Sequence, residues 1–134
     1  MKPIRPSDVS AIEVAFALAS ASDLYPKVLV VQFRGAQATP DDARFLEAHV
    51  TFGMTLFAPD ALVLDLGALA LRSGGAVRQC IRPVEPSLEE GYPLYAVVSP
   101  FNRAAAMQAL PESALVHSVD AALERIRVAG PWAV

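Results

Sequence analysis

The pattern of hydrophobic and polar positions predicts alternating strands and helices along the chain. Large apolar residues alternate with Glu or Ala over residues 12–19, and this period of two is typical of a strand with one face on a core. The many alanines leave a helix as the alternative for this segment. An apolar, β-branched run at residues 27–35 predicts a second strand. The short, turn-rich link at residues 20–26 indicates that the two strands are antiparallel.

Residues 39–42 carry a strong start signal for a helix. Thr39 supplies a hydroxyl N-cap and Pro40 occupies the first helical position. Asp41 and Asp42 then face the positive end of the helix dipole. We expect this helix to run to about Phe57, where a Pro-Asp pair soon follows and ends it.

The helix at residues 40–57 carries more large apolar side chains than one sheet contact needs. Either the N-terminal hairpin or the tail around Trp132 covers the excess, or the helix forms an interface, for example in a homodimer. The two neighbouring apolar stripes consist of Ala43, Leu46, Val50, Met54 and Phe57 and of Phe45, His49, Phe52 and Leu56.

The segment at residues 61–75 is the most informative part of the chain. An apolar run ends in the carboxylate of Asp65, and the turn Ser73-Gly74-Gly75 follows it and can start a helix. We therefore expect a buried strand with Asp65 as its strand-end carboxylate. Such a strand brings polar groups to the carboxyl edge of a sheet, where ligands and partners of open α/β proteins usually bind.

The rest of the chain continues the alternation. Ser73 can cap a helix that begins near Gly75, and Pro83 and Pro86 make that helix short or broken. The later elements are a strand at 93–98, a short helix at 102–110, a strand at 114–117 and a helix that starts at 118–120. The order β-β-α-β-α-β-α-β-α predicts a single α/β domain with a mostly parallel sheet and an antiparallel N-terminal hairpin.

Composition narrows the classes of protein that this chain can be. Its 134 residues, of which 54% are hydrophobic, fit one domain spanning 1–134 with a core at about 12–127. The net charge of -3, with scattered basic residues, argues against a nucleic-acid partner. Cys80 is the only cysteine, which excludes an internal disulfide. No apolar run is long enough to insert in a membrane, and Asp8 and Glu13 argue against a signal peptide, so we expect a cytoplasmic protein.

No group of side chains forms a convincing catalytic or metal site. Asp65 is better explained as an acceptor of loop N–H groups than as a general base. His49 and His117 lack a carboxylate cluster with which to bind a metal. Cys80 is expected to point inward as a small hydrophobic residue, although flanking arginines leave a nucleophile as the alternative. We therefore expect no enzymatic activity, no cofactor and no metal.

Four segments, together with the element order, resemble the STAS domain of anti-sigma factor antagonists and sulfate transporter tails. The resemblance covers roughly residues 12–127 and implies the same α/β fold. The segments are 29–35 with its final glycine, 62–66 with its Asp-Leu pair, 95–100 with its Ser-Pro turn, and the helix start at 118–123.

The motif that marks the regulatory members of this family is altered here. It reads Asp-Ser-Ser/Thr-Gly at the start of the second helix, and its first hydroxyl residue is the phosphorylation switch. Aligned without a gap from Asp65, the motif begins on Ser73 and Gly74 and leaves no hydroxyl at the switch. With one residue deleted, Arg72 replaces the aspartate and Ser73 becomes the phosphoacceptor. Both alignments lack the acidic residue, so we expect phosphorylation control to be lost.

The resemblance implies a non-catalytic regulatory domain that binds another protein, such as an anti-sigma kinase or other regulator. We expect the partner-binding residues to be Arg72, Ser73, Gly74, Gly75 and Arg78, with Ser73 as a possible phosphoacceptor. Two alternatives stay open: a small-molecule or anion-binding domain that uses the helix N-terminus at Ser73-Gly75, and a toxin-neutralising inhibitor of the immunity type. Glu85, Glu89 and Glu90 are either a solvated stretch or a patch for a basic partner.

Overall fold

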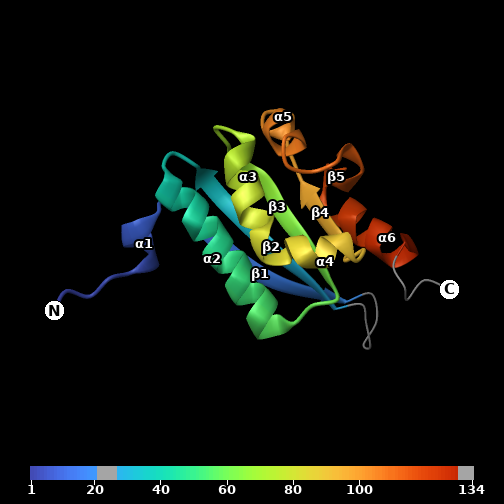
Figure 1. Ribbon diagram of the computed structural model, residues 1–134, viewed down its shortest axis with the longest axis horizontal. Helices are drawn as coiled ribbons and strands as arrows, with labels where there is room; N and C mark the ends of the chain where they lie inside the picture. The colour runs from blue at the N-terminus through green and yellow to red at the C-terminus, as the bar shows by residue number, and fades with distance from the viewer. Residues whose placement is uncertain (21–26, 130–134) are drawn as a thin grey trace.

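A five-stranded sheet in the order β1-β2-β3-β4-β5 forms the centre of the protein. The computed structural model describes residues 1–20 and 27–129 (Figure 1). The antiparallel β1-β2 pair and the otherwise parallel sheet confirm the predicted α/β class, and residues 13–20 are a strand rather than a helix. The predicted turn before residue 27 and the tail at 130–134 lie outside the described residues. The strands are β1 (Glu13–Ser20), β2 (Lys27–Ala36), β3 (Ala61–Ala70), β4 (Leu94–Val97) and β5 (Leu115–Val116).

Helices cover the two faces of the sheet unequally. In Figure 1, α2, α3 and α4 lie on one face and α6 lies on the other. Pro83 and Pro86 interrupt the second helical region, as expected, because η1 separates α3 from α4. The short α1 was not predicted. The helical elements are α1 (Pro6–Val9), α2 (Pro40–Phe57), α3 (Gly74–Ile81), η1 (Arg82–Val84), α4 (Glu85–Glu89), α5 (Arg103–Met107), η2 (Glu112–Ala114) and α6 (Val119–Ala129).

Alternating residues of each strand form two separate cores. On β2, Leu29, Val31 and Phe33 are fully buried beneath α2 and α3. Val28 and Val30 point to the opposite face and join the smaller core beneath α6. α6 packs against β3, β4 and β5 and covers the smaller core. The larger core lies on the other face of the sheet, beneath α2 and α3.

The start of α2 is capped as the sequence predicts. The Thr39 hydroxyl accepts a hydrogen bond from the Asp42 N–H at 3.4 Å, and the Asp42 carboxylate accepts one from the Thr39 N–H at 2.9 Å. This reciprocal pair is a capping box, which satisfies two N–H groups that a helix start otherwise leaves free. At the other end, Ala58 adopts a left-handed conformation with φ 44°, and Pro59 prevents the helix from continuing.

The structure corrects the expected position of Asp65. β3 runs on to Ala70, so Asp65 lies within the strand and is not a strand-end carboxylate. Pairing with β2 explains the extra length: after an irregularity between Gln32 and Arg34, the parallel register resumes at Arg34 and Ala68. Only the β3-β4 pairing stops at Asp65, opposite Val97.

Candidate functional site

The β3-α3 turn has the helix cap that the sequence predicts at Ser73. The Ser73 hydroxyl accepts a hydrogen bond from the Gly75 N–H at 3.3 Å. The preceding N–H, on Gly74, donates to the Gln108 side-chain oxygen of the α5 region at 3.1 Å. Because the first two N–H groups of α3 already have partners within the protein, the turn is less suited to an anion than an open helix N-terminus.

The two glycines of this turn have different surroundings. A Cβ on Gly74 would lie 2.5 Å from the Gln108 Cβ and 2.7 Å from the Ala105 carbonyl oxygen, so only glycine fits there. Gly75 is exposed, and the nearest atom to its Cβ would be the Ser73 Oγ at 3.5 Å. Gly74, which the sequence places among the partner-binding residues, is therefore buried and positions the turn against α5, whereas Gly75 is exposed to solvent.

Arg72 joins the turn to the loop between β2 and α2. Its N–H donates to the Gln37 side-chain oxygen at 3.2 Å, and its guanidinium donates to the Ala38 carbonyl at 3.0 Å. The Gln37 N–H in turn donates to the Ala70 carbonyl at 2.8 Å. Residues 37 and 38 were not among the predicted site residues, because they lie more than one element away in sequence.

Arg78 supports the same turn from the other side. Its guanidinium donates to the Gln108 carbonyl, so α3 is tied to the end of the α5 region. The exposed residues Arg72, Ser73, Gly75 and Arg78 thus form one surface at the carboxyl edge of the sheet. We call these four residues, the exposed members of the set that the sequence predicts to bind a partner, the partner surface.

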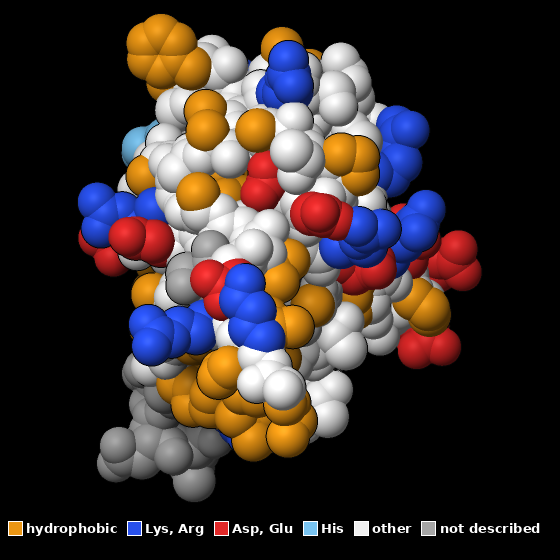
Figure 2. All heavy atoms as spheres, turned by 90° about the vertical axis from the view of Figure 1, so that its left-hand side faces the viewer, with side chains coloured by type: hydrophobic (Ala, Val, Ile, Leu, Met, Phe, Trp, Pro, Cys, Tyr) orange, Lys and Arg blue, Asp and Glu red, His pale blue; other side chains and the backbone are white. Residues whose placement is uncertain are grey.

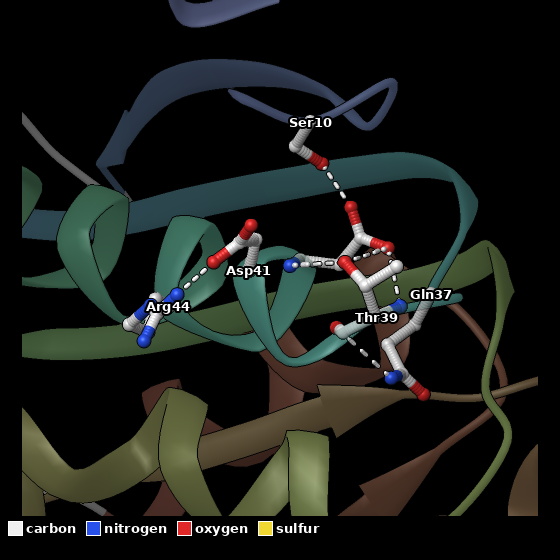
Figure 3. A network of polar contacts seen from close by, with 6 residues as sticks. Ser10, Gln37, Thr39, Asp41 and Arg44 are labelled. Carbon is white, nitrogen blue, oxygen red and sulfur yellow. Dashed lines mark hydrogen bonds and ion pairs between the residues drawn. The ribbon is translucent and has the colours of Figure 1, made fainter. Parts of the chain in front are cut away.

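A buried carboxylate organises the β2-α2 loop, to which the Arg72 guanidinium donates. Asp42 is buried and accepts hydrogen bonds from the Ser10 hydroxyl at 2.5 Å, the Ala38 N–H at 2.7 Å and the Thr39 N–H at 2.9 Å. Figure 3 shows Ser10 and Thr39 of this network, with the ion pair between Asp41 and Arg44 beside them. The Ser10 hydroxyl, followed by the Ala38 N–H, lowers the pKa of Asp42. The sequence indicated only a helix-dipole role for Asp42. Its link to Ser10 ties the N-terminal segment to the loop beside the partner surface.

A buried amide organises the loop between β4 and α5. The Asn102 side chain is 2% exposed and donates to the Leu66 carbonyl at 2.7 Å and to the Leu69 carbonyl at 3.0 Å. Its oxygen accepts from the Ser99 N–H at 2.8 Å. The sequence predicted only a helix start at Asn102. One feature of the sequence could have indicated this role: Asn102 lies two residues after the Ser-Pro turn, a position where an Asn side chain often bonds to the nearby backbone.

Asp65 accepts hydrogen bonds instead of facing a reaction site. Its carboxylate is half-buried and accepts from the Gln32 side-chain amide and from the Gly67 N–H, each at 3.2 Å. His49 packs against the Phe45 ring with 4.1 Å between centroids, and His117 is exposed. Within residues 1–20 and 27–129, no three His, Cys, Asp or Glu side chains gather in a way that could hold a metal ion.

Cys80 points inward, as the sequence predicts. It is 1% exposed, and burial, with a smaller contribution from the charge of Glu47, raises the pKa of its thiol to about 12. We expect a thiol reagent such as 5,5′-dithiobis(2-nitrobenzoate) at pH 8 to leave the folded protein unmodified and to titrate one thiol in 6 M guanidinium chloride. Stoichiometric labelling of the folded protein within minutes would contradict this burial.

The wide apolar arc of α2 is only partly covered. Phe45 and Leu46 are buried, and Phe16 of β1 packs on Phe52 with 5.6 Å between ring centroids. Phe52 nevertheless stays 51% exposed and Leu56 60% exposed. Figure 2, which views the side of the molecule where α1 and α2 lie, shows hydrophobic side chains gathered low on this face and charged ones mainly above them. The hairpin therefore covers part of the arc and leaves its outer edge free in the described part of the chain.

Comparison with known proteins identifies the fold. No protein-family model matches the chain, and no curated protein sequence matches it. An anti-sigma factor antagonist from Mycobacterium paratuberculosis superimposes with a TM-score of 0.59 and 21% identity over 86% of this chain and 95% of that chain. The anti-sigma factor antagonist SpoIIAA in its unphosphorylated form gives 0.58 and 14%, over 84% and 96% of the two chains.

A third solved structure, the Bacillus cell fate determinant SpoIIAA in the phosphorylated form, gives a TM-score of 0.54 and 14% identity over 84% of this chain and 100% of that chain. All three agreements span most of both chains. They also match the mixed five-stranded sheet with helices between its strands. The protein therefore has the STAS fold of the anti-sigma factor antagonists, as its sequence segments predicted.

Proposed function

We propose that the protein is a non-catalytic regulatory domain that binds another protein through the partner surface. The observation that carries this proposal is the β3-α3 turn, which is fixed between the β2-α2 loop and α5 and presents the side chains of Arg72 and Arg78 beside Ser73. A pre-positioned surface loses little conformational freedom on binding. The shared fold supports the regulatory class, because the solved neighbours are named as anti-sigma factor antagonists.

The partner that we propose is an anti-sigma factor or a related regulator in the cytoplasm. Two arginine side chains on the partner surface favour a partner with carboxylates at the matching positions. No described helix is long and apolar enough to cross a bilayer. We also propose that the domain is not an enzyme, because Asp65 and Cys80, the residues most open to a chemical role, are engaged in hydrogen bonds or buried.

We further propose that Ser73 no longer acts as a phosphorylation switch. Its hydroxyl is exposed but serves as the cap of α3. In the alignment with one residue deleted, its neighbour Arg72 stands where the family motif has an acidic residue. The anion-binding alternative is weaker than protein binding because the Gly74 and Gly75 N–H groups already have acceptors. A homodimer would use the exposed Phe52 and Leu56 of α2. Nothing in the site favours a toxin-neutralising inhibitor.

The proposal is tested by isolating the tagged protein from its source cell and measuring the complex by native mass spectrometry, which also counts copies of the chain. We expect a stoichiometric protein partner. With that partner purified, Arg72→Glu and Gly75→Trp should each weaken binding by about 10-fold or more, or about 1.4 kcal/mol. Gly75→Trp should fold because its Cβ has room.

The matched control is Arg125→Glu, which makes the same charge change on α6, on the opposite face of the sheet. We expect it to bind as the unmodified protein does. Circular dichroism checks that each variant is folded. If both site variants bind with full affinity, the partner surface is assigned to the wrong place.

A further inference from the structure

Phe101 is an aromatic side chain held out in solvent. It is 99% exposed, far more than Phe52 at 51%. It lies in the loop after β4, at the same carboxyl edge of the sheet as the partner surface. A fully exposed phenyl ring contributes nothing to the core of the isolated domain, so the whole ring is accessible to a partner.

The loop that carries Phe101 is fixed on both sides of the ring. On one side, the Ser99 N–H donates to the Asn102 side chain, and Pro100 restricts its own backbone. On the other side, the Asn102 amide holds the Leu66 and Leu69 carbonyls of β3. The Arg103 N–H also donates to the Ser99 carbonyl at 3.0 Å. The ring is therefore presented by an ordered backbone, which reduces the entropy lost when a partner binds it.

This loop lies beside the partner surface. α5 begins at Arg103, two residues after Phe101, and packs against the start of α3 (Figure 1). Gln108, directly after α5, accepts hydrogen bonds from Gly74 and Arg78. The Asn102 amide meets the Leu69 carbonyl three residues before Arg72. Phe101 and the partner surface can thus face the same partner.

The charges around this edge indicate the chemistry of that partner. The described contacts of the Arg72 and Arg78 guanidinium groups are neutral carbonyls, those of Ala38 and Gln108. A carbonyl leaves the positive charge of a guanidinium uncompensated, so carboxylates on a partner would complement it. Aromatic side chains, phenylalanine among them, and arginine are enriched in protein interfaces.

We propose that Phe101 is the anchor residue of the interface, and that its ring enters an apolar pocket with acidic residues at its rim on the partner protein. This inference rests on the proposed function and adds the residue and the partner chemistry. A bilayer fits this edge less well because the chain carries a net charge of -3. A second copy of the chain and a lipid surface are the other occupants that the experiment distinguishes.

The first measurement is photo-crosslinking in the source cell, with p-benzoylphenylalanine at position 101 and, in a second strain, at position 75. We expect both positions to give an adduct with the same protein. An adduct at position 75 without one at 101, or an adduct at 101 with a second copy of the chain, would overturn the anchor assignment. Sedimentation with vesicles containing one quarter phosphatidylglycerol tests the lipid surface. If the protein binds these vesicles and Phe101→Ala abolishes the binding, the assignment of Phe101 as a protein anchor is also overturned.

The second measurement is the affinity of the purified partner for matched variants. We expect Phe101→Ala to weaken binding by about 10- to 100-fold and Phe101→Trp to weaken it less. Phe52→Ala removes the same ring from an exposed position on α2 and should change the affinity less than 2-fold. Phe101→Ala should unfold near the temperature of the unmodified protein, and Phe52→Ala, which loses its contact with Phe16, should unfold about 3 °C lower and remain folded.

The outcomes separate the two proposals. If Arg72→Glu weakens binding and Phe101→Ala does not, the anchor inference fails and the proposed function stands. If Phe101→Ala weakens binding, but replacing the partner's contact carboxylates with amides leaves the affinity unchanged, the proposed acidic rim is wrong. If no protein is crosslinked from either position, both proposals fail.

Discussion

Replacing Asp42 with alanine is expected to lower the free energy of unfolding by about 3 kcal/mol, one of the two largest effects that we predict for a single substitution. The buried carboxylate accepts hydrogen bonds from Ser10, Ala38 and Thr39. Its loss removes one half of the α2 capping box and leaves the buried Ser10 hydroxyl without this acceptor. For a domain of 134 residues, the unfolding temperature should fall by about 10 °C.

Two controls separate the network from a general loss of charge. Asp41→Ala removes the neighbouring carboxylate, whose ion pair with Arg44 is exposed, and should cost less than about 1 kcal/mol. Ser10→Ala removes the bond that the Ser10 hydroxyl donates to Asp42 and the one that it accepts from the Ile12 N–H, and should cost about 2 kcal/mol. Urea unfolding followed by circular dichroism measures all three variants. Equal losses for Asp41→Ala and Asp42→Ala would show that the buried network adds nothing.

The lowered pKa of Asp42 also predicts a pH dependence. Because the folded protein holds this pKa below its ordinary value of 3.8, the carboxylate stabilises the fold at pH values above 3.8. That stabilisation is lost as the pH falls through the lowered pKa of the folded state. Asp42→Asn cannot ionise, so the difference in unfolding free energy between it and the unmodified protein should shrink between pH 5 and about pH 2. A constant difference over this range would contradict the assigned cause.

The parts of the fold that the sequence predicted correctly are those set by neighbouring residues. The start of α2 follows from Thr39, Pro40 and Asp42, which act within one helical turn. The period-two pattern of residues 12–19 likewise predicts β1 because one face of the strand meets the core. The break in the second helical region follows from the fixed backbone of Pro83 and Pro86.

The parts that the sequence did not predict depend on distant partners. The length of β3 is set by its pairing with β2, so a polar residue such as Asp65 can lie within a strand whose ladder continues beyond it. The partners of Asp42 and Asn102 include residues more than thirty positions away, at Ser10, Leu66 and Leu69. Turn residues in a sequence do not reveal such partners, because the contacts exist only after the loops meet at one edge of the sheet.

These two buried polar residues give the candidate site its geometry. Asp42 fixes the loop that receives Arg72, and Asn102 fixes the loop that carries Phe101. The surface between them is formed by the capped turn at Ser73. Their substitution should therefore affect partner binding through the positions of neighbouring residues, even though both side chains are buried and cannot touch a partner.

Replacing Asn102 with alanine is expected to lower the free energy of unfolding by about 3 kcal/mol and to release the β4-α5 loop. The substitution removes a buried amide and deprives the Ser99 N–H and the Leu66 and Leu69 carbonyls of that partner. Asn102→Asp keeps the acceptor for Ser99 but places a carboxylate against the two carbonyls, so it should be destabilised at least as much at pH 7. Urea unfolding measures both losses.

Asn102 can act in two ways: it can only stabilise the fold, or it can also position the loop that carries Phe101. The two roles predict different results for hydrogen exchange and partner binding. If Asn102 positions the loop, the backbone amides at positions 99 and 101–103 should exchange faster in Asn102→Ala at temperatures where α2 stays protected, because the loop opens locally. Asn102→Ala should then weaken partner binding even though Phe101 is still present. Adding Phe101→Ala to this variant should weaken binding little further, since both substitutions remove the same anchor. Fully additive losses in the double variant would contradict this coupling. Local protection equal to that of the unmodified protein would show that other contacts hold the loop.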